Sequence, residues 1–542
     1  NPHNRHDGSR KDKHILKHKA GLNLRVFQSG MLNGATPRTR PWFSYGTLDE
    51  SVNNDTQAKR YFEQSKKIVN SYFQAGNLYR VLSGSYKDIG LFSNSAYAML
   101  PHPDLGFYFY PFAIGSYCIA SDADGNTTTF SRDFGLSIRQ VVEKYGHLKP
   151  NGHIDWENSL SPYIKSLWDA GKYQDELILS NVILPNKKPK ENPLFSMDKR
   201  FQSYTYVSGG GSNVPNQERM GFAQQNNPNE RGGKNRFLSV RGYDYFPVIA
   251  PRWEVQAEED WGIDGPSEMA LGYVNALQEK ERYRLEAIAK IVKPPMMGPS
   301  QLRRHQASIL AGGITYFDEG EQGTFKRVFD LDPKLNDLLV SQSEDERDID
   351  TCYFKDLFLM LAGERPTSHV TAVQIQEMAG ERVSAITPIL GQLDQDQNGP
   401  LTENAHYILH SQGRLPEPPK ILKGKPLKVE YTSALAQAAK ASQMKTIERT
   451  VNFTASLSQV LQDPSILQML NSEELLREYY SNAGLEPSLY RDKGEFAQIK
   501  QAVAQQQAQR EAAQAEAQRA ETAKTMSQAK LGENSMLDNA VG

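Results

Sequence analysis

Apolar side chains recur at helical spacing near the start of the chain. Between Asp55 and Gln74 they fall at positions 61, 62, 68, 69, 72 and 73, which is typical of an amphipathic helix. A second helix is predicted from about Asn77 to Met99. The period then changes, and residues 105–130, LGFYFYPFAIGSYCIASDADGNTTTF, predict strands around an Asp-Gly-Asn turn at 124–126. Short strands and loops continue to about Pro251, so the pattern indicates an α+β fold.

Two long helices around an insert are predicted further along the chain. The first runs for about 27 residues from Pro266, a good first-turn residue, and stops before Pro294 and Pro295. At 1.5 Å per residue it would be roughly 40 Å long. The second begins near His369. The insert predicts strands at GITYF and TFKRVF and carries the acidic run SEDERDID at 343–350.

The chain ends in helical patterns that follow an extended strip after Pro416. The stretch QAVAQQQAQREAAQAEAQRAETAK, residues 501–524, predicts a helix in which Val503 is the only large apolar side chain. Such a helix cannot bury enough area alone to offset the entropy of ordering it. A frayed, disordered tail is the alternative that this composition allows.

Composition excludes several classes of protein. With 542 residues, more than one domain is expected. A formal net charge of −2 gives no electrostatic case for tight DNA wrapping or membrane adsorption. Cys118 and Cys352 cannot form a disulfide framework, which favours assembly in a reducing compartment. No apolar run approaches the roughly 20 residues of a membrane span, and the first residues do not read as a signal peptide.

The candidate chemical motifs all have simpler interpretations. DQDQNG, Asp394 to Gly399, copies the start of an EF-hand loop, but its twelfth position is Ala405 instead of Glu, so a polar loop or helix break is favoured over calcium. The glycine loops SGGGS and RGGKN lack a P-loop signature. His14 and His18 share a helical face, yet their basic neighbours indicate a solvated arm. The sequence therefore predicts no catalytic site, no metal and no cofactor.

Several stretches follow one another along the chain. They are RPWFSYG, NLYRVLSGSYKDIGLFSNSAYAML, PRWEVQAEEDWGIDGPSEMALGYVNALQ (251–278), TAVQIQEMAGERVSAITPILGQLDQDQNGPLTENAHYIL (371–409) and LPEPPKILKGKPLKVEYTSALAQAAK (415–440). In this order they resemble the head-to-tail connecting (portal) protein family of short-tailed bacteriophages. The resemblance spans about residues 40 to 440. This chain departs from the family at Ser93, where the family has Gly, at Trp261, where it has Tyr, and at Gln374, where it has Glu.

The resemblance implies a portal-type subunit in a ring, typically of twelve, at one vertex of the capsid. It divides the chain into an N-terminal wing (1–260), a first stem helix (261–292), a clip (293–368), a second stem helix (369–391), a tunnel loop (392–400), C-terminal wing helices (401–484) and a crown (485–542). Double-stranded DNA would pass through the channel. The terminase large subunit and then tail adaptor or nozzle proteins would dock on the clip, and major capsid and scaffolding proteins would be further partners within the virion.

Three sets of residues carry the site predictions that follow from this resemblance. The tunnel loop would present Gln392, Asp394, Gln395, Asp396, Gln397 and Asn398 to the DNA. The clip interface would use Arg303, Arg304, Glu344, Asp345, Glu346 and Asp348. In the crown, Ala504, Ala508, Ala512 and Ala515 form a stripe along which neighbouring copies would pack.

Two alternatives from other classes remain. A DNA-associated nuclease or ATPase would need carboxylates gathered around Mg²⁺ or a nucleotide loop, and the sequence has neither pattern. A ring-forming tail adaptor would lack the order of long helix, insert and long helix.

Overall fold

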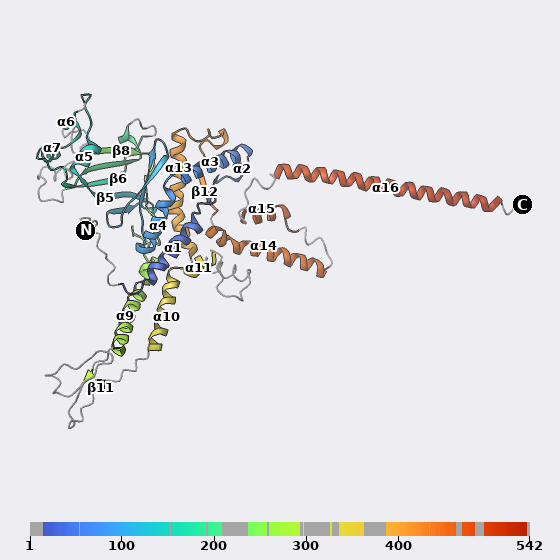
Figure 1. Ribbon diagram of the computed structural model, residues 1–542. Coiled ribbons are helices and arrows are strands. Elements are labelled where there is room, and N and C mark those ends of the chain that lie inside the picture. The colour runs from blue at the N-terminus through green and yellow to red at the C-terminus, as the bar shows by residue number, and fades with distance from the viewer. Residues whose placement is uncertain are drawn as a thin grey trace, which may run out of the picture. The chain divides into compact units, whose positions relative to one another are not determined.

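The computed structural model describes residues 15–53, 55–151, 153–190, 193, 195–208, 237–256, 259–292, 296–297, 326–327, 335–361, 386–432, 434–461, 469–482 and 493–538. They fall into two units, Asn1–Ala439 and Lys440–Gly542. Figure 1 shows the elements of both units, which are taken one at a time below.

The core of the first unit is built from helices α1 (Lys19–Ala35), α2 (Glu50–Asn53), α3 (Thr56–Ala75) and α4 (Leu78–Phe92). The predicted helix from Asp55 is confirmed, because the Asp55 side chain accepts hydrogen bonds from the backbone of Gln57 and Ala58 and so caps α3. Rings of Trp42, Phe43 and Phe73 are fully buried together. Strand β1 (Phe43–Thr47) pairs antiparallel with β12 (Leu427–Tyr431), so both ends of this unit share one core.

The second predicted helix ends earlier than the sequence pattern suggested. Helix α4 stops at Phe92, and Ser93 takes a left-handed conformation with φ 59°. The chain then forms β2 (Tyr97–His102), which pairs with β3 (Gly106–Pro111) and β9 (Val248–Ile249). The prediction of helix to Met99 is therefore wrong, because tertiary pairing in this small sheet outweighs the local helical spacing of the apolar residues.

A five-stranded antiparallel sheet forms the outer part of the first unit. Its strands β4 (Tyr117–Ser121), β5 (Thr127–Ser137), β6 (Glu176–Pro185), β7 (Phe201–Val207) and β8 (Ser239–Tyr243) follow one another in order. The predicted turn at 124–126 is confirmed, and Gly125 there has φ +79°. The sheet is accompanied by α5 (Ile138–Tyr145), α6 (Trp156–Ser159), α7 (Pro162–Asp169) and the 3₁₀ turn η2 (Ser196–Asp198).

The long helix from Pro266 is confirmed as α9 (Pro266–Val292). It packs against α10 (Leu335–Cys352), which is followed by α11 (Lys355–Leu361). Figure 1 shows α9 and α10 side by side. We call this helix pair the stalk. The acidic run at 343–350 is thus part of a stalk helix and not of a small α/β insert.

Parts of the predicted insert and of the second long helix lie outside the described residues. Within TFKRVF, β11 (Lys326–Arg327) pairs with β10 (Met296–Met297), while GITYF is among the residues left out. The helix predicted from His369 is described only from residue 386. Residues 386–393 are helical and continue through a π-helical turn, η4 (Asp394–Asn398), into α13 (Gly399–Ser411). A short 3₁₀ turn, η5 (Lys420–Leu422), precedes β12.

The remaining helices are α14 (Ala434–Leu461), α15 (Ser472–Asn482) and α16 (Lys493–Asp538). Helix α16 is 46 residues long, so the helix predicted at 501–524 is confirmed and extends in both directions. Ala508 and Ala512 of the predicted stripe are exposed along it. Among the helices described, none is both long and apolar enough to cross a membrane.

Candidate functional site

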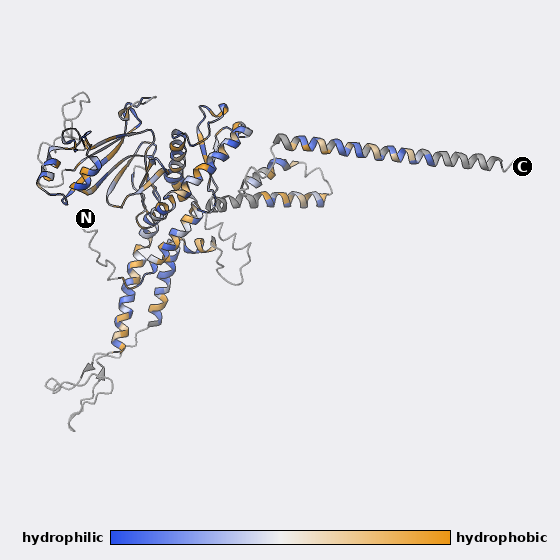
Figure 2. Ribbon diagram, turned by 45° about the horizontal axis from the view of Figure 1, so that its top comes forward, coloured by the Kyte–Doolittle hydropathy of each residue, from blue (hydrophilic) through white to orange (hydrophobic). Residues whose placement is uncertain are grey.

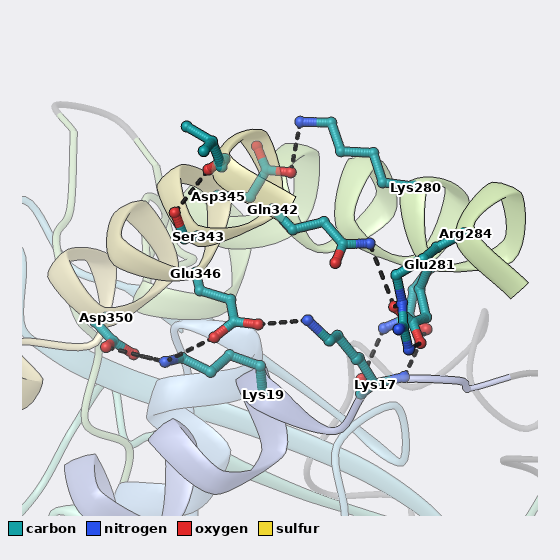
Figure 3. Close-up of polar contacts among 12 residues, drawn as sticks. Lys17, Lys19, Lys280, Glu281, Arg284, Gln342, Ser343, Asp345, Glu346 and Asp350 are labelled. Carbon is teal, nitrogen blue, oxygen red and sulfur yellow. Dashed lines mark hydrogen bonds and ion pairs between the residues drawn. The ribbon is translucent and has the colours of Figure 1, made fainter. Parts of the chain in front are cut away.

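The two stalk helices meet along a polar seam. Glu281 of α9 is 5% exposed and Gln342 of α10 is 2% exposed, and the Gln342 amide donates to the Glu281 carboxylate at 3.2 Å. Arg284 donates to the same carboxylate from two nitrogens, at 2.8 and 2.6 Å, and these hydrogen bonds lower the pKa of Glu281. On the other side of the seam, Lys280 pairs with Asp345 at 2.7 Å (Figure 3). Hydrogen bonds and ion pairs therefore join the two helices beside the buried Leu277 and Ile349.

An N-terminal segment lies across the stalk and binds both of its helices. The Gln278 amide oxygen of α9 accepts from the backbone nitrogens of Leu16 and Lys17 at 2.8 and 3.1 Å, and its nitrogen donates to the Lys17 carbonyl at 2.7 Å. Lys17 pairs with Glu346 of α10 at 2.5 Å, and Lys19 pairs with Asp350 at 2.9 Å (Figure 3). The hydrogen bond from Lys17 lowers the pKa of Glu346. Burial alone would raise the pKa of Asp350, but hydrogen bonds from Lys19, Asn23 and Lys355 lower it overall.

These contacts change the interpretation of the predicted clip interface. Asp345 and Glu346 are engaged within the chain, while Glu344 and Asp348 are exposed on α10. Arg303 and Arg304 lie outside the described residues. The four acidic side chains therefore belong to the stalk, and only two of them are free to meet another molecule.

Many large apolar side chains of the stalk are exposed, although Leu277 and Ile349 are buried. On α9 they include Leu271 at 58% exposed, Tyr273 at 41% and Tyr283 at 52%, and Figure 2 shows such apolar positions on both stalk helices. The others are Met269, Leu285, Ile288, Ile291, Val292, Leu339 and Val340. At 3.6 residues per turn, Tyr273 and Ile291 fall on one flank of the buried positions of α9, and Leu271 and Leu285 on the other. The stalk thus carries uncovered apolar side chains on both flanks.

The predicted tunnel loop is instead a helical segment held in the protein interior. Residues 394–398 form a π-helical turn, and Asp396, Gln397 and Asn398 are buried. Arg252 donates to the Asp396 carboxylate from two nitrogens, at 2.8 and 2.9 Å. It also donates to the Gly125 carbonyl at 2.8 Å and to the Ser121 hydroxyl at 3.1 Å. The loop prediction is wrong for these residues because a partner 144 positions away supplies the charge that lets a carboxylate be buried.

The remaining side chains of this segment also bind within the chain. Gln397 donates to the buried Tyr86 hydroxyl at 3.0 Å, and Asn398 donates to Asp394 at 2.7 Å. Burial raises the pKa of Asp394 to about 6, although the bond from Asn398 opposes that rise. Gln392 donates to Asp396, and the exposed Gln395 donates to Asn126. The segment therefore connects the core to the β4–β5 hairpin. No group of three or more His, Cys, Asp or Glu side chains in the part of the chain described here is arranged to hold a metal ion.

Comparison with known proteins assigns the chain to a family. The family model described as bacteriophage head to tail connecting protein matches residues 1–225 and 212–490 of this chain. The chain belongs to the bacteriophage head to tail connecting protein family.

Individual relatives agree with this assignment. The portal protein of Salmonella phage epsilon15 is 29% identical over 98% of this chain and 90% of its own length. The probable portal protein of Bordetella phage BPP-1 is 26% identical over the same shares of the two chains. The neck of an empty GTA particle, a solved structure, covers 82% of this chain and 90% of its own chain at 10% identity, with a TM-score of 0.37 that is too low to establish a common fold.

One departure from other head to tail connecting proteins has a structural explanation. At Ser93, where the resemblance places a glycine, the backbone is left-handed, a conformation that glycine adopts without strain. The Ser93 hydroxyl donates to Glu268 at 2.7 Å and accepts from the backbone nitrogen of Gly265 at 3.0 Å. These bonds join the end of α4 to the start of α9 and offset the strain. Gln374, a second departure, lies outside the described residues.

The residues that sequence reasoning missed act through distant partners. Arg252, Gln278 and Lys17 each bind groups more than a hundred positions away. Arg252 had one available signal, because it is a lone cation in the otherwise apolar stretch FPVIAPRW.

Proposed function

We propose that this chain is a portal subunit, which forms a ring at one capsid vertex and provides the conduit through which DNA enters and leaves the head. The family assignment and the two portal relatives support this function. In this proposal the protein is a structural part of the virion and not an enzyme. A ring of about twelve copies is expected from the resemblance.

The observation that carries the proposal is the arrangement of the stalk. Leu277 and Ile349 are buried near the polar seam, but many large apolar side chains remain exposed on both flanks of the stalk, as is typical of a surface that meets another chain. In a ring every subunit has a neighbour on each side, and two flanks of this kind would be covered at once. Covering an apolar side chain gains roughly 1.5–3 kcal/mol.

In this proposal the stalk is the stem, and residues 293–334 between its helices are the clip. The terminase large subunit would dock there first and tail adaptor or nozzle proteins later, while major capsid and scaffolding proteins would contact the outer parts of the ring. The near-neutral charge of the chain suits a channel along which phosphates must slide, because each phosphate neutralised by a basic group adds affinity.

Negative-stain imaging of the purified chain, together with its mass by light scattering, tests the proposal. We expect rings with a central hole. Leu271→Asp and Tyr273→Asp, one on each flank, should reduce the ring fraction, whereas Lys290→Asp, exposed on the side of α9 away from the seam, should not. A wild-type chain that remains monomeric at all concentrations would contradict the proposal, as would equal ring formation by all three variants.

A further inference from the structure

Three cations converge on one face of the five-stranded sheet. Arg132 of β5 lies directly across from Asn181 of β6, which lies across from Thr205 of β7, so these side chains share one face. Arg241 of β8 lies across from Ser203, two residues from Thr205, on the same face. Lys144 reaches this face from α5, the helix that follows β5. Figure 1 shows α5 close to β5, β6 and β8. We call Arg132, Lys144 and Arg241 the cationic cluster.

Aromatic rings hold two members of the cationic cluster in place. The Arg132 guanidinium lies over the rings of Phe112 and Phe134, 4.7 and 4.3 Å from their centroids. The Lys144 amino group lies over Phe134 and Tyr145, at 5.9 and 5.4 Å. Both cations therefore share the ring of Phe134. Such packing fixes the position of a cation and leaves its remaining N–H groups available to a ligand.

The members of the cationic cluster are close enough to repel one another. Burial lowers the pKa of Arg132. Although part of the Lys144 side chain is exposed, its packing against the rings lowers the pKa of its amino group, and the charges of Arg132 and Arg241 lower it further. Like charges gathered in this way cost free energy in the isolated chain, and an anion bound among them would recover it.

Among the described residues, no carboxylate pairs with any member of the cationic cluster, although nearby cations do find partners. Arg139, on the same helix as Lys144, pairs with Glu143 at 2.9 Å. Lys199 pairs with Asp244, which follows β8, at 2.9 Å. The floor of the site is neutral and already satisfied, because Asn181 donates to both Ser203 and Thr205. The cluster therefore differs from the ordinary charged surface around it.

We propose that the cationic cluster binds an acidic side chain of another protein chain in the assembled particle. A carboxylate fits the two parallel N–H groups of a guanidinium. Arginine and aromatic side chains packed together are typical of the energetic centres of protein interfaces. Duplex DNA would offer phosphates to the same guanidinium groups. The preference for a carboxylate rests on the proposed function, since a conduit that bound phosphates tightly would oppose sliding.

Fluorescence anisotropy with a labelled hexaglutamate peptide tests this assignment on the full chain at low salt. Wild-type protein should bind the peptide, and Arg132→Gln/Arg241→Gln should weaken binding more than tenfold. Arg132→Lys, which keeps the charge and loses the planar fork, should fall between them. Arg139→Gln is the matched control, since it removes an exposed arginine on α5 that already has a partner, and it should stay within twofold of the wild type.

Several results would overturn the assignment. One is that the wild type does not bind the peptide, and another is that Arg139→Gln weakens peptide binding as much as Arg132→Gln/Arg241→Gln does. A third is that a labelled 20-base-pair duplex binds more tightly than the peptide and that its binding depends on the same arginines. Matching thermal unfolding curves for all variants would show that each has folded. Because the peptide assay requires neither rings nor DNA passage, its failure is distinct from failure of the proposed function.

Discussion

The buried ion pair between Arg252 and Asp396 offers the sharpest test of how this subunit is held together. The Arg252 side chain is 1% exposed and that of Asp396 is 4% exposed, and two hydrogen bonds of 2.8 and 2.9 Å join them. In Asp396→Asn the guanidinium would stay buried without its counter-charge. Removing one partner of such a pair costs about 3–5 kcal/mol. We expect the lower end, because Gly125 and Ser121 still accept hydrogen bonds from Arg252.

Hydrogen exchange measured by mass spectrometry is the appropriate assay, since a chain with two units need not unfold in a single step. A loss of about 3 kcal/mol corresponds to opening that is roughly a hundredfold more frequent. The increase should appear in peptides that cover the β4–β5 hairpin and residues 386–411, which Arg252 joins. Glu143→Gln breaks the exposed pair with Arg139 by the same amide-for-acid change and should cost only about 0.3–0.5 kcal/mol.

The reasoning would be refuted if Asp396→Asn accelerated exchange no more than Glu143→Gln does. A double variant provides a second check. Replacing both partners, as in Arg252→Met/Asp396→Leu, removes the buried charge altogether, and such replacements are often neutral or stabilising. The double variant should therefore exchange more slowly than Asp396→Asn. If it exchanged faster, the contacts of Arg252 with Gly125 and Ser121 would outweigh the ion pair.

Three further predictions concern single side chains, each measured by the hydrogen exchange of peptides that cover the changed residue. Burial raises the pKa of Asp394 to about 6, so its contribution to stability is present at low pH and is lost as the pH rises through 6. Asp394→Asn should therefore gain up to about 3 kcal/mol over the wild type at pH 7 and almost nothing at pH 3, and a pH-independent difference would contradict this. Burial lowers the pKa of His406 to about 4, so the stability of the wild type should fall as the pH drops from 6.5 to 4. His406→Gln should make stability depend less on pH in this range, and an unchanged pH dependence would contradict the prediction. Ser93→Ala and Ser93→Gly both lose the hydroxyl, but only the alanine keeps the strain of the left-handed backbone. Ser93→Ala should therefore be less stable than Ser93→Gly by about 1 kcal/mol. A more stable Ser93→Ala would show that this strain is absent.

Local sequence signals were sufficient to predict an element wherever its own residues determine where it begins or ends. Asp55 caps α3, Pro266 begins α9, and Gly125 makes the turn between β4 and β5. Helix α16 was predictable from composition alone, because alanine and glutamine favour helix without needing a core.

The same signals failed where a distant partner decides the conformation. Gly399 and Pro400 after Asp394 read as a break in the helix, yet the chain passes through a π-helical turn at 394–398 and continues directly into α13. The polar side chains that precede Pro400 were predicted to be solvated. Asp396 and Gln397 are instead buried, because they form hydrogen bonds with Arg252 and Tyr86. The acidic run of α10 looked free for another molecule, and its partners Lys17 and Lys19 are more than three hundred positions away.

The position of Asp396 also changes how DNA contact should be tested. A lysine introduced there would lie against the buried guanidinium of Arg252, so like charges would be forced together in the interior. Slow DNA packaging by such a variant would then result from a disrupted fold and not from tighter binding of phosphate. Substitutions meant to probe the proposed channel belong at exposed positions of the stalk. Glu344 and Asp348 of α10 can be changed to lysine without removing any hydrogen-bond partner among the described residues. A packaging defect in those variants that salt relieves would arise from charge alone, because exposed charges are screened whereas a broken interior is not.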